Sequence, residues 1–310
     1  MFTRRFTFLF FLSFVGAFPN CRSSQNVIPP AATAQDARLR AELEACRRAH
    51  ATQVSHDELA QLRRELQTGL DLANEETLHR TAMRQAMEVY SRGVCLIHGA
   101  FTVLELQGQN LAPARDSEGN VIELEYLGSG FLAGDTGWVV TNRHVAEPWW
   151  NNDSVQPLIA RGLKPTLLRL TATFPGKDPI AVDPSTIRLG GDEIDVAVFS
   201  VQAEGLPSLP LSSDDPRVLR GQRIMLMGYP TGLNALLARA ERNVVAEALS
   251  VATDTESLIR ELSRRGALAP VVTHGSLNDV TDSKLIYDAI TTSGGSGGPV
   301  FGPDGTVIGV

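Results

Sequence analysis

Apolar residues in the first third of the chain follow the spacing of a helix. They recur three or four positions apart in two runs, first Leu39, Leu43 and Cys46, and then Leu59, Leu62, Leu66 and Leu70. Charged residues fill most positions between them and proline is absent from 36–90, so this segment is predicted to be helical. Ser55 followed by Glu58 is typical of a helix start, which predicts a break near residue 55. These helices either pack on the rest of the chain as a hairpin or join copies of the chain as a short coiled coil.

From residue 91 on, the pattern changes to short apolar, β-branched runs separated by glycine, proline and aspartate. Such runs predict strands, here at Val94–Leu106, Glu123–Leu132, Trp138–Asn142, Leu167–Phe174, Val196–Val201, Arg223–Met227, Leu285–Ile290 and Thr306–Val310. Many short strands with these separators are typical of antiparallel barrels. Residues 91–310 are therefore predicted to form one mainly β domain.

Helical spacing returns inside this β domain between about residues 230 and 275. Apolar residues alternate there with charges, as in Leu258, Ile259 and Leu262 among glutamates and arginines. We interpret the segment as a surface helical hairpin that covers one barrel. The alternative is a lid or activation loop beside a functional site.

The first 22 residues have the pattern of a targeting segment. Arg4 and Arg5 precede a short apolar run, and small residues up to Ala17 suit cleavage. This pattern predicts a signal peptide and hence an extracytoplasmic protein, either secreted or in a bacterial periplasm. A retained membrane anchor and a lipoprotein signal at Cys21 are the alternatives. Residues 23–35, with Pro29 and Pro30, are predicted to be a linker.

Composition narrows the possible partners. The chain of 310 residues has a net charge of −7 and no cluster of basic residues, so we expect no nucleic-acid partner. Its three cysteines do not form a disulfide framework. The sequence shows neither a metal-ligand spacing nor a cofactor motif, and we expect neither a metal nor a cofactor. The β domain is long enough to rest on its own apolar core.

Three residues carry the candidate chemistry. Ser296 lies among glycines, where a hydroxyl can stand exposed beside converging backbone N–H groups, as acyl transfer requires. His144 follows an apolar run, and a strand end can hold an imidazole rigidly as a general base. Asp195 opens another apolar run, where a carboxylate needs a partner and can orient the histidine. The order His, Asp, Ser is that of the chymotrypsin fold.

Four short motifs carry a family resemblance. They are Gly128-Ser129-Gly130-Phe131, Thr141-Asn142-Arg143-His144-Val145, Asp195-Val196-Ala197-Val198 and Gly294-Gly295-Ser296-Gly297-Gly298-Pro299. In this order they resemble the trypsin-like serine peptidases of the HtrA/Deg type, over roughly residues 94–310. The resemblance implies two antiparallel β-barrels of the chymotrypsin-like fold, preceded here by the helical segment, with the site in the cleft between them.

The resemblance also implies a role for each site residue. Ser296 is the nucleophile, His144 the general base and then acid, and Asp195 the residue that orients His144. Gly294, Gly295 and Ser296 form the oxyanion hole, with the N–H groups of Gly294 and Ser296 as donors. The base of the specificity pocket falls at Ile290, Thr291 and Thr292. No acid is present there, so small or medium apolar side chains are expected in the pocket.

Two features depart from the family pattern. Gly295 stands where relatives usually carry Asn or Asp, which predicts a looser oxyanion loop. The sequence ends at Val310, where relatives continue with another barrel strand and a C-terminal helix, so the protease domain is expected to be incomplete. An incomplete second barrel leaves the specificity pocket without one wall and a sheet edge open.

The sequence thus predicts a serine endopeptidase that cuts peptide bonds of exposed or misfolded proteins through a His-Asp-Ser triad and an acyl-enzyme. Its expected partners are protein or peptide substrates and, through the N-terminal helices, further copies of the chain. The alternative function is a weak or inactive protease-fold scaffold that binds extended peptides.

Overall fold

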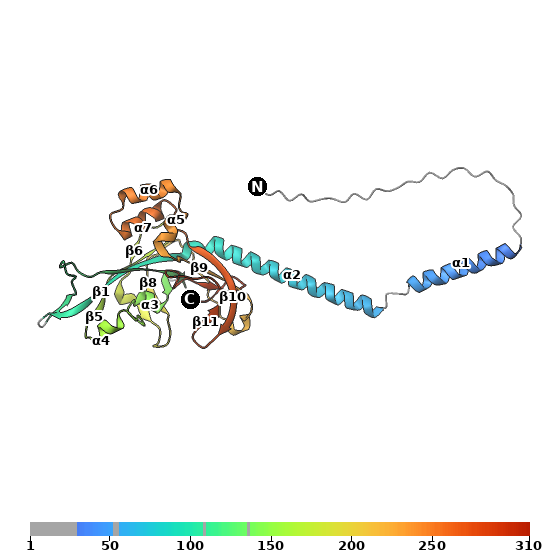
Figure 1. Cartoon of the computed structure of the whole chain (residues 1–310), viewed down its shortest axis with the longest axis horizontal. Helices are drawn as coiled ribbons and strands as arrows, with labels where there is room; N and C mark the ends of the chain where they lie inside the picture. Colours follow the sequence, from blue (N-terminus) through green and yellow to red (C-terminus); the bar gives the residue numbers. More distant parts are fainter. Residues whose placement is uncertain (1–29, 52–55, 108–109, 135–136) are drawn as a thin grey trace. The chain divides into compact units, whose positions relative to one another are not determined.

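The computed structural model describes residues 30–51, 56–107, 110–134 and 137–310. The predicted signal segment 1–22 and the helix-starting Ser55 lie outside these residues. Contacts divide the chain into two compact units, residues 1–69 and 70–310. The described part of the chain begins with two helices, α1 (Pro30–Ala51) and α2 (His56–Tyr90), and continues with strands (Figure 1). Helix α1 begins within the stretch 23–35 predicted as a linker.

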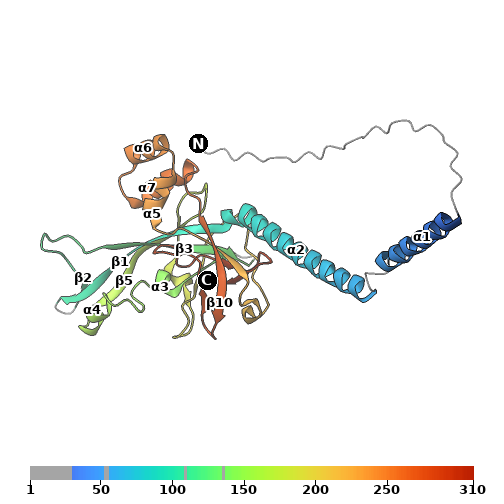
Figure 2. The same ribbon diagram turned by 45° about the vertical axis from the view of Figure 1, so that its right-hand side comes forward.

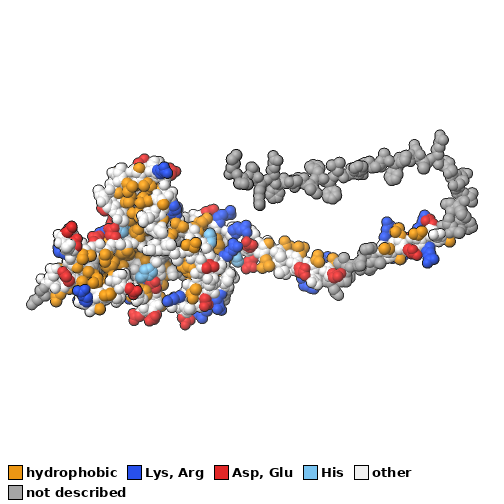
Figure 3. All heavy atoms as spheres, in the orientation of Figure 1, with side chains coloured by type: hydrophobic (Ala, Val, Ile, Leu, Met, Phe, Trp, Pro, Cys, Tyr) orange, Lys and Arg blue, Asp and Glu red, His pale blue; other side chains and the backbone are white. Residues whose placement is uncertain are grey.

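The leucines of the predicted stripe lie on the surface of the first unit. Leu62 and Leu66 of α2 are 67% and 65% exposed. Apolar side chains are visible along α2 between charged ones (Figure 3). None of the described helices is both long and apolar enough to cross a membrane. In the second unit, Met83 and Ala86 near the end of α2 are buried in the core of the β domain.

Two antiparallel sheets, each curled into a half-barrel, make up most of the second unit, so the prediction of a mainly β chymotrypsin-like fold is confirmed. The first sheet has the strand order β6-β5-β1-β3-β4-β8-β7, with β2 paired to β1. Its strands are β1 (Val94–Gln107), β2 (Asn110–Pro113), β3 (Leu124–Ala133), β4 (Trp138–Thr141), β5 (Lys164–Thr173), β6 (Ile180–Ala181), β7 (Arg188–Leu189) and β8 (Ala197–Ser200). The short helices α3 (Arg143–Ala146) and α4 (Gln156–Ala160) follow β4.

The second sheet has the order β11-β10-β9-β12-β13. Its strands are β9 (Arg223–Gly228), β10 (Val271–Val280), β11 (Leu285–Tyr287), β12 (Val300–Phe301) and β13 (Val307–Gly309). Each of the eight predicted strands overlaps an observed one. Strand β10 was missed, because the helical segment was extended to residue 275 over its β-branched start at Val271, Val272 and Thr273.

The prediction of a helical hairpin between residues 230 and 275 is wrong in number and in length. Three helices form, α5 (Gly232–Arg239), α6 (Arg242–Val251) and α7 (Thr255–Arg264). Helices α5 and α7 correspond to the two helices of the predicted hairpin, and α6 is the additional one. Asp254 explains why α7 starts separately from α6, because its carboxylate accepts from Ser257 N while the Ser257 hydroxyl accepts from Asp254 N, which forms a capping box. Helix α7 ends at Arg264, well before residue 275.

The three helices cover one face of the first sheet, above β1 and β5 in Figure 2. Leu96 of β1 lies in one core cluster with Leu236 of α5 and Ile259 of α7. At the edges of this layer, the Ser263 hydroxyl donates to Lys177 O at 2.6 Å. The opposite face of the sheet has its own core, which includes Ile97, Leu132, Val139, Leu170 and Phe199. The middle of the first sheet is therefore buried on both faces, which makes it a rigid support for the site.

Candidate active site

The three candidate catalytic residues come from segments that each follow or precede a strand. His144 lies in α3, directly after β4 ends at Thr141. Asp195 lies just before β8, which pairs with β4. Ser296 lies in the loop that leads into β12 of the second sheet. Pairing of β4 with β8 brings His144 and Asp195 together although 51 residues separate them.

Asp195 binds His144 through both carboxylate oxygens. His144 Nδ1 lies 2.8 Å from Asp195 Oδ2, and the backbone N–H of His144 donates to Oδ1 at 3.0 Å. Burial raises the pKa of Asp195, but the hydrogen bonds from the ring and backbone of His144 outweigh it and hold that pKa below its usual value. The carboxylate therefore stays ionised at neutral pH and keeps Nδ1 as the protonated ring nitrogen, which leaves Nε2 free to accept a proton.

Asn142 joins the three catalytic segments, a role that its place in the sequence motif did not suggest. As the first residue before α3 it could cap that helix, yet its side chain makes no cap hydrogen bond. Instead Asn142 Nδ2 donates to Asp195 O at 2.8 Å, and Asn142 Oδ1 accepts from Gly297 N at 2.7 Å. The Asn142 side chain thus links the start of helix α3, which carries His144, to the segment of Asp195 and to the loop of Ser296.

The nucleophile loop, residues 293–298, holds its peptide groups in defined orientations. Ser293 O accepts from Thr231 N at 2.7 Å, and Gly295 O accepts from Gly298 N at 3.1 Å. In a trans peptide the N–H points away from the preceding C=O. These bonds therefore turn the N–H groups of Gly294 and Ser296 to the opposite side of the chain. Neither N–H has an acceptor among the described residues, whereas Gly295 N–H donates to Thr292 O at 2.9 Å.

Gly295 does not leave a gap in the loop. A Cβ atom at this position would lie 2.8 Å from Thr291 Oγ1 and 3.1 Å from Thr292 O, which is too close. A side chain at this position would require Thr291 to move. The backbone of the loop is hydrogen-bonded on both sides of Gly295.

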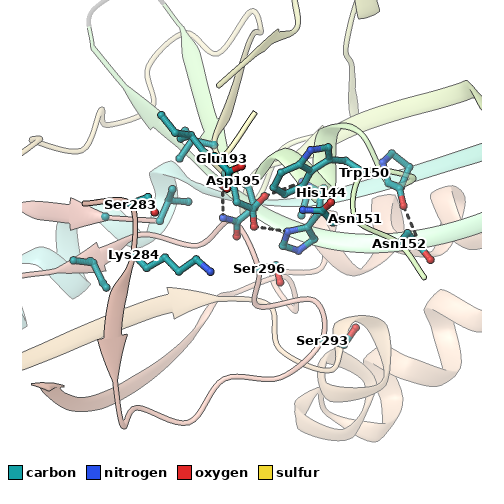
Figure 4. Close-up of a pocket in the computed structure, with 18 of the residues that line it drawn as sticks. His144, Trp150, Asn151, Asn152, Glu193, Asp195, Ser283, Lys284, Ser293 and Ser296 are labelled. Atoms are coloured by element: carbon teal, nitrogen blue, oxygen red, sulfur yellow. Dashed lines mark hydrogen bonds and ion pairs between the residues drawn. The ribbon is translucent and has the colours of Figure 1, made fainter. Parts of the chain in front are cut away.

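Ser296 shares a cleft of about 1480 Å³ with His144 and Asp195. Figure 4 shows its hydroxyl beside the His144 ring, with Ser293 farther along the loop. Among the described residues the Ser296 hydroxyl has no hydrogen bond to His144, a contact that in resting enzymes is often long and tightens with substrate. Acidic residues on the rim, Asp153, Asp192 and Glu193, are exposed.

The predicted pocket residues have different surroundings. Ile290 and Thr291 line a small cavity of about 120 Å³ together with Gly295 and Ser296. Ile290 is nevertheless 76% exposed. Thr292 is absent from the lining of this cavity, and its carbonyl instead supports the loop. No cluster of three or more metal-ligating side chains occurs in the described part of the chain.

Known proteins resemble this chain at the level of the family. The trypsin-like peptidase domain model matches residues 128–310. A probable periplasmic serine endoprotease of the DegP-like kind from Halomonas elongata is 28% identical over 204 residues, 66% of this chain and 32% of that protein. A protein of the same description from Chlamydia muridarum is 28% identical over 184 residues, 59% of this chain and 27% of that protein. The chain thus spans about a third of the length of these relatives.

Two solved structures are similar in arrangement. The serine endoprotease from Yersinia pestis has a TM-score of 0.41 and 17% identity, over 74% of this chain and 56% of that chain. Deg5 has a TM-score of 0.43 and 19% identity, over 74% of this chain and 84% of that chain.

Proposed function

This chain belongs to the trypsin-like peptidase domain family, and from that premise we propose that it is a serine endopeptidase with His144, Asp195 and Ser296 as its triad. The observation that carries the proposal is the pair of bonds between Asp195 and His144 in the cleft that also holds Ser296. The oriented N–H groups of Gly294 and Ser296 support it, since both lack another acceptor among the described residues.

The reaction follows from this geometry. Ser296 Oγ attacks the carbonyl carbon of the scissile bond while His144 Nε2 takes the hydroxyl proton. Asp195 stabilises the imidazolium that forms, and the N–H groups of Gly294 and Ser296 bind the oxyanion. The tetrahedral intermediate collapses, the C–N bond breaks, and the leaving amine takes the proton from His144. Water, deprotonated by His144, then hydrolyses the acyl-enzyme and restores Ser296.

The proposed substrates are exposed or misfolded proteins outside the cytoplasm. The cleft is open along the rim residues, which suits an extended chain rather than a small molecule. The relatives are named periplasmic, and the first 22 residues have the pattern of a targeting segment, which supports the same location for this chain. The exposed leucines of α1 and α2 support assembly into oligomers.

A fluorophosphonate probe tests the proposal directly. The probe should label the wild-type chain, and peptide mapping should find the label on Ser296. Ser296→Ala should abolish labelling. Ser250→Ala is the control, because Ser250 is exposed on α6, does not line the cleft and should not affect labelling. Asp195→Asn should lower turnover about 10⁴-fold. An unlabelled wild-type chain that is folded would contradict the proposal.

A peptide-binding scaffold is the second candidate. Strand β11 pairs only with β10 in the described part of the chain, so its outer edge offers unpaired backbone groups to an extended peptide. A peptide that binds wild type and Ser296→Ala equally, without hydrolysis over hours, would favour this function over the protease.

A further inference from the structure

Ser129 lies beneath the nucleophile loop and contacts it twice. It is a residue of β3, fully buried, and 165 residues from the loop in sequence. Its hydroxyl donates to Gly294 O at 2.7 Å, and its backbone N–H donates to Ser296 O at 2.8 Å. A strand of the first sheet thus holds the carbonyl groups on both sides of Gly295.

The direction of the Ser129 hydroxyl proton is fixed by a third contact. Tyr229 N donates to Ser129 Oγ at 2.9 Å, so the hydroxyl accepts from Tyr229 and must use its single proton on Gly294 O. The Ser129 carbonyl is held as well, because it accepts from the Thr141 hydroxyl at 2.7 Å. Each polar group of Ser129 therefore has a partner, and the residue cannot easily turn.

These contacts fix the backbone conformation of Gly294. Its φ is +89°, a conformation that glycine adopts without strain and from which it can also leave easily. The Thr231 N–H fixes the peptide group before Gly294 by donating to Ser293 O, and the Ser129 hydroxyl fixes the peptide group after it by donating to Gly294 O. With both peptide groups held, the N–H of Gly294 keeps the orientation that an oxyanion would require.

We propose that Ser129 is a positioning residue that preorganises the oxyanion hole by holding the Gly294 carbonyl. This inference rests on the proposed function, since it concerns the same reaction. Without the hydroxyl, the buried Gly294 O and Tyr229 N both lose their partner, and buried unpaired groups favour rearrangement. The peptide groups around Gly294 then rotate, and its N–H leaves the cleft.

The matched control is a second buried serine that also binds backbone carbonyl oxygens. Ser263 of α7 is fully buried and donates to Lys177 O, but it has no contact with the loop. Ser263→Ala therefore removes an equivalent hydrogen bond elsewhere. Ser129→Cys serves as a second variant with nearly the same volume and a weaker donor, for use if Ser129→Ala does not fold.

The experiment measures fluorophosphonate labelling rates of the full chain, followed by kcat and KM on a fluorogenic peptide that the wild type cleaves. We expect Ser129→Ala to slow labelling and lower kcat about 10²-fold with KM nearly unchanged, because a displacement of about 1 Å in a catalytic group costs that much. Ser129→Cys should give an intermediate rate. Ser263→Ala should keep the wild-type rate at temperatures where it is folded.

Three results would overturn the inference, and they are distinguishable. If folded Ser129→Ala or Ser129→Cys is labelled at Ser296 as fast as wild type, the positioning role fails while the protease function stands. If the loss appears in KM alone, Ser129 supports substrate binding and not the oxyanion hole. An unlabelled wild-type chain would overturn the proposed function and this inference together.

Discussion

Two sets of buried or half-buried polar side chains lie in the first sheet and the turn after it, and their hydrogen bonding is opposite. The paired set, Ser129, Thr141 and Asn142, is hydrogen-bonded throughout and supports the nucleophile loop. The unpaired set, Thr102 and Thr173, is fully buried and has no side-chain hydrogen bond among the described residues. His98 is also fully buried, and its Nε2 lies 3.8 Å from Glu125 Oε1, beyond hydrogen-bond distance.

The difference shows which region of this protein is held in one arrangement by hydrogen bonds. A buried polar group with good partners specifies one arrangement, whereas a buried group without partners only costs stability. The paired set lies where a displaced peptide group would damage the chemistry. The unpaired set lies on β1 and β5, and neither Thr102 nor Thr173 lines the cleft. Three pairs of variants test this contrast.

The largest loss of stability and activity is expected from Gly297→Ala, because its side chain would clash with residues of the paired set. The new Cβ would lie 2.0 Å from Ser129 O and 2.2 Å from Thr141 Oγ1, and φ is +89°. Strain and overpacking together should lower the free energy of unfolding by about 3 kcal/mol or more. Labelling of Ser296 should be lost, and thermal unfolding would measure the stability.

Gly266→Ala separates the two causes of that loss. Gly266 also has a positive φ, +73°, but no atom within 4 Å of a built Cβ. It should cost only the backbone strain, about 1 kcal/mol. Equal losses in the two variants would mean that the contacts around Gly297 do not matter.

His98 should make stability depend on pH. Burial lowers its pKa from 6.5, a shift that the Glu125 and Glu256 carboxylates oppose and Arg169 reinforces. Below about pH 6.5 the unfolded chain binds a proton that the folded chain does not, so the free energy of unfolding falls with falling pH. The loss should reach at most about 1.4 kcal/mol between pH 6.5 and 5.5. Unfolding by urea at several pH values measures it.

His98→Leu should remove this part of the pH dependence and leave the rest of the curve unchanged. His274→Gln is the control, because His274 is exposed on β10 and should leave the wild-type slope intact. A His98→Leu variant with the wild-type slope would show that His98 does not titrate differently in the folded chain.

The smallest expected change in the free energy of unfolding has opposite signs in the two sets. Thr173→Val removes a buried hydroxyl without a partner and should stabilise the protein by about 1 kcal/mol. Thr141→Val removes an equally buried hydroxyl that donates to Ser129 O and should destabilise it by a similar amount. If both variants shift the unfolding midpoint in the same direction, the contrast between the sets is wrong.

Much of the fold and the site could be predicted from local patterns. Short apolar runs located eight strands, and three motifs in order identified His144, Asp195 and Ser296 as one candidate site. Strand β10 was missed because helical spacing just before it was extended too far. Helix α6 was missed because its N-cap residue, Glu241, makes no side-chain cap hydrogen bond, so no local signal marks the break after α5.

The sequence by itself determined the chemical groups of this protein and their order, because a nucleophile, a base and a glycine-rich loop are recognisable from residue types. Only the tertiary structure decided how those groups are held. Ser129 and Asn142 contact the loop across 165 and 155 residues, and no spacing rule reaches so far. The same holds for the burial of His98, which depends on packing between distant segments. Local pattern reports what a residue can do, and packing between distant strands decides which partners it meets.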